Sequence, residues 1–436
     1  MEIPCWLVAA ADRAPEHPAI ETAAEAVAYD DLLGRADTVA RRLAARGVTA
    51  GQRVALVLPP GVAFAEAFHG CWRLGAVPVP VDPRLTPGER AVRATGAAAI
   101  VDQRLDGDEA DTPLLDAHRP DALAAVVHTS GTTTAPRPIG LTFANFGASA
   151  RGSAAVLGHD AGERWLSALP VAHVGGLSVL VRSAAFATTA ILHERFDAGA
   201  VAGALRDRDV TVVSLVATML ARLLEAGLEQ PPALRCALLG GGALPPALAE
   251  RAAAAGIAVA QTYGLTEACS QVTTSEIGEP ETAGRPLPGT RVEVSPEGEI
   301  LVAGPTVAPG AAGEDGVLRT GDLGALDEAG RLTITGRRAD TIVTGGENVA
   351  PAEVEAVLAT HPAVAEAAVY GRSDPEWGQR VVAAVVLRPG AVGAVEELRA
   401  HCRSALAGFK VPKEIWFTSD GLPRTPSGKL LRRALA

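Results

Sequence analysis

Short apolar runs and longer helical patterns follow one another along the first part of the chain. Residues 31–46 carry apolar side chains at helical spacing on one face, and residues 62–74 predict a second helix. The runs at 54–58 and 77–81 are short and continuously apolar, which is typical of buried strands. Strands that alternate with helices in this way predict an α/β fold, built from mostly parallel sheets that are covered by helices.

The alternation continues as far as Gln261. Apolar runs predict strands at 124–127, 165–169, 190–192, 211–216, 235–239 and 257–261. Helical patterns lie at 143–155, 176–187, 201–205, 218–226 and from Pro245 onward. These elements extend the layered α/β architecture over the larger part of the chain.

Beyond residue 274 the pattern changes twice. Proline and glycine become dense and short alternating runs appear, which predicts a small antiparallel β unit over about 275–336. From Asp340 onward the elements are those of a compact α+β unit. They are predicted helices at 354–358 and 395–406 and predicted strands at 363–370, 380–387 and 414–417.

We therefore expect two domains. The large N-terminal domain covers 1–336, including the small β unit, and the small C-terminal domain covers 340–436. The hinge between them lies at 337–340.

One polar stretch follows the predicted strand at 124–127. Its hydroxyl and glycine residues are Thr129, Ser130, Gly131, Thr132 and Thr133. A strand that ends in such a turn leaves backbone N–H groups unpaired, and these groups and the hydroxyls can hold phosphate oxygens. The alternative is a polar surface turn, because Ser, Thr, Gly and Pro are common in turns. The stretch does not have the GxxxxGK[ST] spacing of a Walker loop.

Composition argues against several classes of protein. The 436 residues are 48% hydrophobic and 20% charged, as in packed globular proteins, and their net charge is −11. This excess of acid argues against nucleic acid or an anionic membrane as a partner. The N-terminus lacks the basic start of a secretory signal, and no stretch has the roughly 20 apolar residues that span a bilayer. The five cysteines are scattered, so that we expect a reduced, cytoplasmic protein without a zinc site or disulfide framework.

Six motifs follow one another along the chain. They are the stretch around Gly131, YGLTE at 263–267, RTGDLG at 319–324, GRRAD at 336–340, GGENVAP at 345–351 and PRTPSGK ending at Lys429. In this order they resemble the adenylate-forming acyl-CoA ligases, the family of acyl-CoA synthetases, luciferases and peptide-synthetase adenylation domains. The resemblance runs from about residue 10 to the end. It implies a large domain for ATP and a carboxylic acid, followed by a small mobile domain.

The resemblance assigns ATP to these motifs. The loop around Gly131 would hold the β- and γ-phosphates, Thr266 a phosphate oxygen, and Glu267 the Mg²⁺, which prefers oxygen ligands. The residues implied for the nucleoside are Gly240, Gly241, Gly242, Tyr263, Gly264, Asp322 and Arg337. Among them, Tyr263 offers a flat face to adenine and Asp322 accepts the ribose hydroxyls. Taken singly, Glu267 is typical of a solvated loop acid, Tyr263 of a core aromatic and Asp322 of a turn cap.

Lys429 lies in a Pro-Ser-Gly turn near the C-terminus, where a lysine is most often a solvated surface charge. By resemblance it bridges the carboxylate and the α-phosphate during adenylation, a task that suits a compact charge on a flexible stem. The C-terminal domain would then turn about the hinge, at Ala339 or Asp340. Gly345 and Gly346 would line the path of CoA, whose thiolate attacks the acyl-adenylate.

The chain departs from the family pattern in three places. The loop, usually TSGTTGxPKG, has Thr134, Arg137 and Pro138 in place of Gly, Lys and Gly, which predicts a stiffer loop and a forked cationic contact from Arg137 to phosphate. Ala339 stands where the family often has Asp or Lys, so that the pivot stays open between Ala339 and Asp340. The chain is also short for the family, which predicts that extra substrate loops are absent.

Three stretches bear on the identity of the acid. They are ALPVAHVGGLSVLVRS at 168–183, HERFD at 193–197 and TYGLTEACSQVTT at 262–274. They resemble family members that act on o-succinylbenzoate, an aromatic dicarboxylic acid of menaquinone biosynthesis. Arg182 would bind the second carboxylate, with Ser178 and Thr274 as weaker candidates, and His173 would lie beside the carboxylate that reacts. The alternative for Arg182 is a structural ion pair, and the alternative for His173 is a structural loop histidine.

Two other functions stay open at this point. One is a ligase for another aromatic or short-chain carboxylic acid. The other is a non-catalytic protein that binds a nucleotide or an acyl-adenylate, which the altered phosphate loop would allow. The ligands implied are ATP, Mg²⁺, CoA and a small acid, and replacement of Lys429 should abolish adenylation only in an enzyme. The oligomeric state, including a homo-oligomer, stays open.

Overall fold

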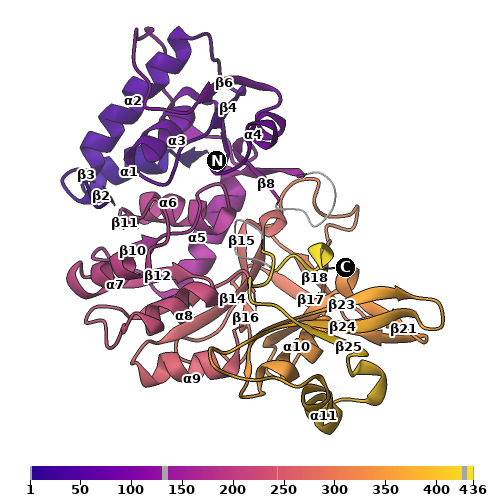
Figure 1. Ribbon diagram of the computed structural model, residues 1–436. Coiled ribbons are helices and arrows are strands. Elements are labelled where there is room, and N and C mark those ends of the chain that lie inside the picture. Colours follow the sequence, from indigo (N-terminus) through magenta and orange to yellow (C-terminus); the bar gives the residue numbers. More distant parts are fainter. Residues whose placement is uncertain (1, 130–135, 243, 425–429, 436) are drawn as a thin grey trace. The chain divides into compact units, whose positions relative to one another are not determined.

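The computed structural model describes residues 2–129, 136–242, 244–424 and 430–435. Its contacts divide the chain into two compact units (Figure 1). Unit 1 comprises Met1–Val292 and Val302–Leu318, and unit 2 comprises Glu293–Leu301 and Arg319–Ala436. Both units combine helices and sheets, so that the predicted α/β class is confirmed.

A nine-stranded sheet forms the centre of unit 1. From edge to edge its strands are β16 (Arg285–Pro286), β15 (Ser270–Thr274), β14 (Val259–Leu265), β13 (Cys236–Leu239), β12 (Val212–Leu215), β10 (Arg164–Ser167), β11 (Thr189–Leu192), β2 (Pro18–Glu21) and β3 (Ala26–Ala28). The six strands from β14 to β2 run parallel to one another, and the edge strands join them antiparallel. Such a sheet needs helices as cover. The helices that follow its strands are α6 (Val174–Phe186), α7 (Ala198–Asp207), α8 (Ala217–Glu225) and α9 (Pro246–Ala254).

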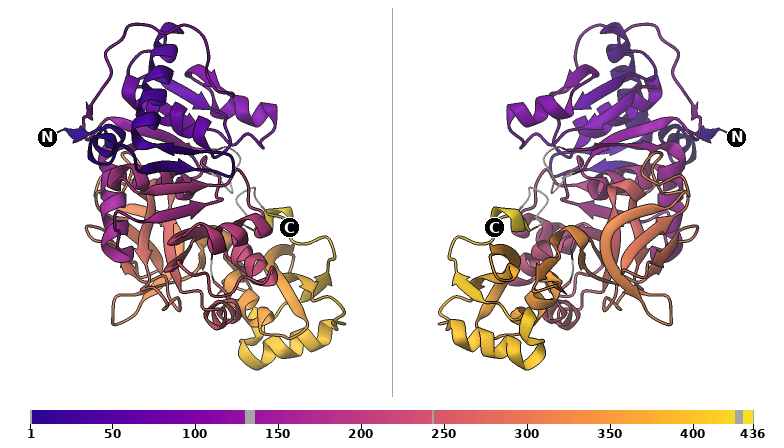
Figure 2. Two further views of the ribbon diagram at one scale, coloured as in Figure 1. Left: turned by 90° about the vertical axis from the view of Figure 1, so that its left-hand side faces the viewer. Right: turned by 90° about the vertical axis from the view of Figure 1, so that its right-hand side faces the viewer.

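Smaller sheets and further helices complete unit 1. A parallel sheet contains β5 (Val77–Pro80), β4 (Arg53–Leu56) and β6 (Ala97–Val101), and a short antiparallel pair contains β1 (Ile3–Pro4) and β7 (Ala117–His118). The helices around them are α1 (Trp6–Arg13), α2 (Tyr29–Ala45), α3 (Val62–Leu74), α4 (Pro87–Arg93) and α5 (Phe143–Leu157). Figure 2 shows this N-terminal part, in indigo and purple, from two sides. The predicted helix at 62–74 has the bounds of α3, and the predicted strands at 54–58 and 77–81 correspond to β4 and β5.

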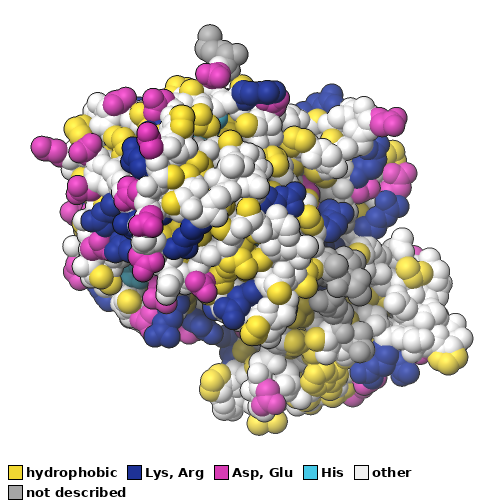
Figure 3. Space-filling model, turned by 90° about the horizontal axis from the view of Figure 1, so that it is seen from above, with side chains coloured by type: hydrophobic (Ala, Val, Ile, Leu, Met, Phe, Trp, Pro, Cys, Tyr) yellow, Lys and Arg dark blue, Asp and Glu magenta, His cyan; other side chains and the backbone are white. Residues whose placement is uncertain are grey.

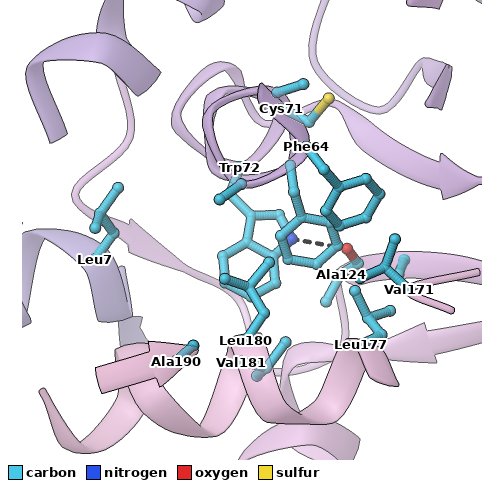
Figure 4. Packing of buried hydrophobic residues seen from close by; sticks show 14 of the residues in the cluster. Leu7, Phe64, Cys71, Trp72, Ala124, Val171, Leu177, Leu180, Val181 and Ala190 are labelled. Atoms are coloured by element: carbon cyan, nitrogen blue, oxygen red, sulfur yellow. Dashed lines mark hydrogen bonds between the residues drawn. The ribbon is translucent and has the colours of Figure 1, made fainter. Parts of the chain in front are cut away.

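Trp72, a residue of α3, lies in the hydrophobic core of unit 1 and faces α6 and β8 (Leu123–His128) (Figure 4). Its indole ring packs over Leu180 and Val181 of α6. Its indole N–H donates a hydrogen bond of 2.7 Å to the buried carbonyl of Ala124. This bond ties α3 to the strand that leads into the glycine- and hydroxyl-rich stretch.

The predicted polar turn after β8 does not lead directly into the predicted helix, because a strand that was not predicted lies between them. Residues Pro138–Thr142 form a strand, β9, which pairs antiparallel with β8, with Val127 opposite Ile139. The prolines and the glycine of this stretch indicated a turn, but Pro138 is the first residue of β9, where a missing N–H does not interrupt the ladder. β8 and β9 therefore form an antiparallel pair, and α5 begins directly after β9, at Phe143 as predicted.

Two further sheets lie mainly or wholly in unit 2. The first has the order β17 (Arg291–Val294), β18 (Glu299–Ala303), β19 (Leu318–Leu326) and β20 (Leu332–Arg337), and its β19–β20 pair is antiparallel. The second has the order β22 (Glu347–Val349), β21 (Ile342–Thr344), β24 (Gly378–Leu387) and β23 (Val364–Asp374), with β25 (Glu414–Phe417) also paired to β24. Two helices, α10 (Pro351–Ala359) and α11 (Val395–Ala405), pack on the second sheet around a core of Val, Leu and Ile.

The contacts group the four-stranded sheet with the C-terminal elements, whereas the sequence predicts a domain boundary after residue 336. β20 runs directly into the 3₁₀ turn Arg338–Asp340, and α10 contacts β20, which explains this grouping. The predicted domain limits stay a prediction.

On the face shown in Figure 3, acidic and basic side chains are interspersed. Many such charges are paired at the surface of unit 1, for example Arg35 with Glu25 and Arg46 with Asp106. None of the helices within the described ranges combines the length and the apolar character needed to cross a membrane.

Candidate active site

The two ends of the polar loop after β8 are held together. The Thr129 N–H donates to the Arg137 carbonyl at 3.0 Å, and the Arg137 N–H donates to the Thr129 hydroxyl at 3.4 Å. These bonds continue the β8–β9 ladder by one step beyond His128 and Pro138. The predicted phosphate ligands Ser130, Gly131, Thr132 and Thr133 lie outside the described residues.

Arg137 and Glu267 are brought together from positions 130 residues apart. A guanidinium N–H of Arg137 donates to a Glu267 carboxylate oxygen at 3.0 Å. The Glu267 side chain is 16% exposed and that of Arg137 is 69% exposed, so that the acid is largely shielded from solvent and the base is not. The Glu267 carbonyl accepts the Ala308 N–H at 2.8 Å, which fixes its backbone. A carboxylate held beside Arg137, close to the end of the polar loop after β8, is suited to a hard cation such as Mg²⁺.

The described residues contain no group of three or more His, Cys, Asp or Glu side chains that could hold a metal alone. A cation at Glu267 would therefore need further oxygen ligands, such as phosphates and water, which is the usual mode of Mg²⁺.

The YGLTE motif forms a tight hairpin between β14 and β15. Gly264 lies at a bulge, and a Cβ built on it would fall 1.8 Å from the Ser270 carbonyl oxygen, so that only glycine fits. The turn itself contains Thr266 and Glu267, and it closes through Cys269 and Ser270, whose φ angles are +52° and +91°. Non-glycine residues in this region are strained, and such strain is concentrated at functional sites. The Cys269 thiol is fully buried, and burial raises its pKa, as expected of a packing residue.

The predicted adenine site lies on adjacent strands of the same sheet. Tyr263 is in β14 and is 9% exposed. Gly240, Gly241 and Gly242 directly follow β13, the neighbour of β14. A Cβ at Gly240 would lie 3.2 Å from the Thr262 side chain, and Gly241 has φ +80°. The strand ends and the glycine turn thus leave backbone exposed next to Tyr263.

His173 caps the N-terminus of α6, and its N–H donates to the Pro170 carbonyl at 3.0 Å. Asp82, from the loop after β5, lies near it. Burial alone would raise the Asp82 pKa, but hydrogen bonds from Arg84 and, to a smaller degree, the charges of Arg84 and His173 hold this pKa below its usual range. Asp82 is 5% exposed and was not predicted from the sequence, which shows it only as one acid in a proline-rich turn.

Arg182 lies on α6, nine residues beyond His173, or about 13 Å along the helix axis. It is 4% exposed, donates to the Ser149 hydroxyl at 3.3 Å and stacks 5.5 Å from the Trp165 ring. Burial lowers its pKa to about 10. No carboxylate in the described part of the chain pairs with it, so that the structural ion pair considered above is not present there. The cavity beside it, about 10 Å³, has room for about one water molecule.

The two weaker candidates for the acid differ in hydrogen bonding. The Ser178 hydroxyl is buried on α6 and has no partner among the described residues. The Thr274 hydroxyl accepts from Gln271 at 2.9 Å and lies 2.8 Å from the Thr273 carbonyl, which uses its donor and one of its lone pairs. The Gln271 side-chain carbonyl oxygen is also buried without a partner among the described residues, but it can only accept, so that Ser178 alone of these three offers an uncommitted hydroxyl donor to an acid.

Unit 2 carries the predicted ribose ligands. Asp322 and Arg337 lie opposite one another in the β19–β20 pair, and their side chains form an ion pair of 2.7 Å. Asp322 is buried, with its side chain 7% exposed, at a turn where Gly321 has φ +70°. The structure thus brings these two predicted residues together in one hairpin.

The remaining predicted residues of unit 2 lie further along the chain. Ala339 and Asp340 form a 3₁₀ turn with Arg338 after β20. Gly345 and Gly346 form the turn between β21 and β22, with φ +59° and +84°. A Cβ at Gly345 would lie 2.7 Å from the Trp377 ring, whereas one at Gly346 would meet open space. Lys429 lies outside the described residues.

Comparison with protein-family models defines the class of this protein. Residues 7–311 match the AMP-binding enzyme model, and residues 353–429 match the model of the AMP-binding enzyme C-terminal domain. The chain belongs to the AMP-binding enzyme family, and the family predicted from its six motifs is confirmed.

Within that family, the chain is similar to 2-succinylbenzoate–CoA ligases. It is 38% identical to the enzyme of Bacillus cereus, with 99% of this chain and 98% of the relative covered. It is 37% identical to the enzyme of Bacillus subtilis, with 100% and 98% covered. Two solved structures of the o-succinylbenzoate CoA synthetase MenE from Bacillus subtilis superpose with TM-scores of 0.92. One, in complex with the acyl-adenylate intermediate OSB-AMP, is 35% identical, with 100% of this chain and 98% of that chain covered. The other, in complex with ATP and magnesium ion, is 36% identical, with both chains fully covered.

Proposed function

We propose that the chain is an ATP-dependent ligase that converts o-succinylbenzoate (2-succinylbenzoate) to its CoA thioester, a step of menaquinone biosynthesis. The main support is similarity to 2-succinylbenzoate–CoA ligases over the whole length of the chain, at 37–38% identity. The cofactors and co-substrate of the proposed reaction are ATP, Mg²⁺ and CoA.

The proposed reaction has two steps. In the first, a carboxylate oxygen of the acid attacks the α-phosphorus of ATP, the bond to the β-phosphate oxygen breaks, and pyrophosphate leaves. In the second, the CoA sulfur attacks the acyl carbon, the bond to AMP breaks, and the thiol proton is released. The first step joins two anions, so that the protein must supply positive charge and hold the reactants in line.

Arg137 and Glu267 are suited to the phosphates. Glu267 would hold Mg²⁺, which neutralises phosphate charge when it is bound. Arg137, now paired with Glu267, has 69% of its side chain exposed and could turn its guanidinium to a phosphate oxygen in a forked contact. The hydroxyls of Thr129 and Thr266 would add neutral donors.

The nucleoside would be bound by the remaining predicted residues. Tyr263 would face adenine across the backbone of Gly240 to Gly242, which has no side chains to obstruct a planar base. Asp322 would accept the ribose hydroxyls, and Arg337, its ion-pair partner, would orient it.

Lys429 would carry the charge that bridges the carboxylate and the α-phosphate. The chain has only three lysines among its 39 basic residues. The other two have partners in unit 2, because Lys410 is paired with Glu353 and Lys413 lies 5.4 Å from the Trp377 ring. Arginines supply nearly all the other positive charge of the chain, so that the compact ammonium of Lys429 is a rare kind of cation in this sequence. Gly346 has the open space that the pantetheine arm of CoA would need.

The acid would be selected near α6. His173 would lie beside the reacting carboxylate, and Ser178, one to two turns further on, would meet the second carboxylate. Arg182 is without an acid partner in the described chain but has room for about one water beside it, so that a direct contact to the acid would require α6 or α5 to move. Ser178, whose hydroxyl can donate, is therefore the better-placed residue.

The test is a substrate panel with purified protein, read as pyrophosphate release and as CoA thioester formation. Release with o-succinylbenzoate should exceed release with benzoate, succinate or a fatty acid by about two orders of magnitude, since the binding energy of a second carboxylate is worth several kcal/mol when its partners are buried. Lys429→Ala should slow adenylation at least about 100-fold, and the matched control Lys410→Ala should not. Equal rates with all acids would leave only the family assignment. An absence of adenylation with every acid would support the non-catalytic alternative.

A further inference from the structure

The segment between β20 and β21 is fixed on its N-terminal side by ion pairs to the four-stranded sheet. Arg337 pairs with the buried carboxylate of Asp322 at 2.7 Å. Arg338 pairs with Glu299 of β18 at 3.2 Å, and the other oxygen of Glu299 accepts the Gly321 N–H at 2.9 Å. Glu299 is 12% exposed at its side chain. Arg337, the last residue of β20, and Arg338, the first residue of the 3₁₀ turn, are thus attached to the same sheet.

The C-terminal side of this segment is fixed to a different part of unit 2. The carboxylate of Asp340 accepts a hydrogen bond of 2.8 Å from Arg432. The same guanidinium makes two bonds to Glu355 of α10, at 2.7 and 3.0 Å, which is a bidentate pair of the stronger kind. Glu355 also accepts the Val369 N–H at 2.8 Å, so that Arg432 is anchored to the C-terminal sheet.

Ala339 is the residue between these two sets of ion pairs. Its methyl side chain is exposed, and it lies in the middle of the 3₁₀ turn Arg338–Asp340. Rotation at Ala339 would leave both sets intact. Rotation at Asp340 would have to break a pair that ties it to Arg432.

Arg432 also holds the chain that follows Lys429. The Leu431 N–H donates to the Pro423 carbonyl at 2.8 Å, and Arg424 and Leu430 form an isolated β-bridge, so that the described residues on both sides of 425–429 are paired with one another. Leu430 packs against the core around Tyr370. Arg432, two residues further on, joins this anchored tail to Asp340.

We propose that Arg432 is a positioning residue that joins Asp340, the residue after the pivot, to the C-terminal tail that follows Lys429, so that turning is confined to Ala339. This inference rests on the proposed two-step reaction. The C-terminal elements would then turn as one body, and Lys429 would arrive at the reacting atoms in a fixed place. Without Arg432, both the hinge and the tail would gain a second point of flexion.

The test measures the two half-reactions separately. Adenylation is read as pyrophosphate release from ATP and o-succinylbenzoate without CoA, and the second step as thioester formation from synthetic acyl-adenylate and CoA. Arg432→Gln should slow adenylation at least tenfold and thioester formation less than threefold, because the Gly345–Gly346 turn is held by the sheet and not by Arg432. Asp340→Asn should likewise slow adenylation more than thioester formation. Arg432→Lys should restore part of the adenylation rate that Arg432→Gln loses.

The matched control is Arg372→Gln, which removes another arginine that pairs with a glutamate, Glu414, at 2.7 Å in the same body but away from the hinge. It should leave the ratio of the two half-reactions unchanged. Parallel loss of both half-reactions in Arg432→Gln would show a merely structural role, and an unchanged ratio would also overturn the proposal.

A second measurement does not depend on activity. Amide hydrogen exchange of peptides covering 338–344 should accelerate in Arg432→Gln and Asp340→Asn and not in Arg372→Gln. Equal exchange in all three variants would contradict the proposal even in an active enzyme. If the wild type forms no adenylate with any acid, the proposed function fails, and the exchange comparison still decides whether Arg432 restrains the hinge.

Discussion

His69 is a titratable group inside the core of unit 1, and its removal should change how stability depends on pH. It lies on α3, is 1% exposed, and both of its ring nitrogens are without a hydrogen-bond partner among the described residues. Its ring lies 5.6 Å from Phe68 and 5.2 Å from Trp72. Burial lowers its pKa from 6.5 to about 3. The imidazole is therefore neutral in the folded chain and takes up a proton in the unfolded chain.

The sign and size of the effect follow from this difference. Above pH 6.5 neither the folded nor the unfolded state binds the proton, and His69 does not lower the free energy of unfolding. As the pH falls from 6.5 towards 3, only the unfolded state is protonated, and the free energy of unfolding falls by about 1.4 kcal/mol for each pH unit. At pH 5 the wild type should have lost about 2 kcal/mol of its free energy of unfolding through this group. His69→Leu abolishes that loss. At pH 7 the variant should be near neutral, because it removes two unsatisfied buried nitrogens, worth about 1–3 kcal/mol, along with ring contacts of about 1 kcal/mol.

The assay is urea unfolding at pH 7 and at pH 5, followed by tryptophan fluorescence, to which Trp72 contributes from beside the mutated site. The free energy of unfolding of His69→Leu relative to wild type should rise by about 2 kcal/mol between the two pH values. Phe68→Leu is the matched control, since it removes a neighbouring ring that does not titrate, and its cost should be equal at both. If His69→Leu and wild type lose stability in parallel, the reasoning from burial is refuted.

Three further changes have expected results. Trp72→Phe removes the indole N–H and leaves a buried carbonyl unsatisfied, and should lower the free energy of unfolding by about 2 kcal/mol in urea titrations; a loss below about 0.5 kcal/mol would contradict the importance of that bond. Gly264→Ala places a Cβ 1.8 Å from a backbone oxygen and should abolish ATP binding, measured calorimetrically, whereas Gly242→Ala meets nothing within 4 Å and should keep the fold, as shown by an unchanged melting temperature. Arg137→Gln should raise KM for ATP about tenfold in pyrophosphate-release assays, while Arg137→Lys retains most of the affinity; an unchanged KM would remove Arg137 from the phosphate site.

The elements that could be predicted from the sequence are those with a strong local pattern. The bounds of α3 follow from a mostly apolar segment of helical length that ends before Gly75, and Gly75 takes the left-handed conformation that ends helices. The central parallel strands were visible as short apolar runs because both of their faces are buried. β9 was missed because Pro138 and Gly140 are typical of turns, and its identity as a strand depends on pairing with β8.

The candidate site also has features that a local sequence pattern predicts and features that depend on the folded chain. Its motifs predict which residues would meet phosphate, ribose and metal, but not the partners of these residues in the folded chain. The pairing of Glu267 with Arg137, and that of Asp340 with Arg432, join positions 130 and 92 residues apart, and no local pattern specifies either. The position of Arg182 depends on which face of α6 meets α5, which one sequence does not determine.

The acids that the motifs assign to ligands are all held by arginines in the absence of those ligands, and the strength of each pair bears on how binding can proceed. Arg137 is 69% exposed, so that its pair with Glu267 is screened by water and contributes at most about 1 kcal/mol. Exchange of this partner for a metal and phosphates therefore costs little. Asp322 is 7% exposed and opposes Arg337 in the strand register, which makes that pair part of the scaffold. In the proposed function, the nucleoside would therefore bind Asp322 with Arg337 still in place, whereas Glu267 would exchange Arg137 for its ligands.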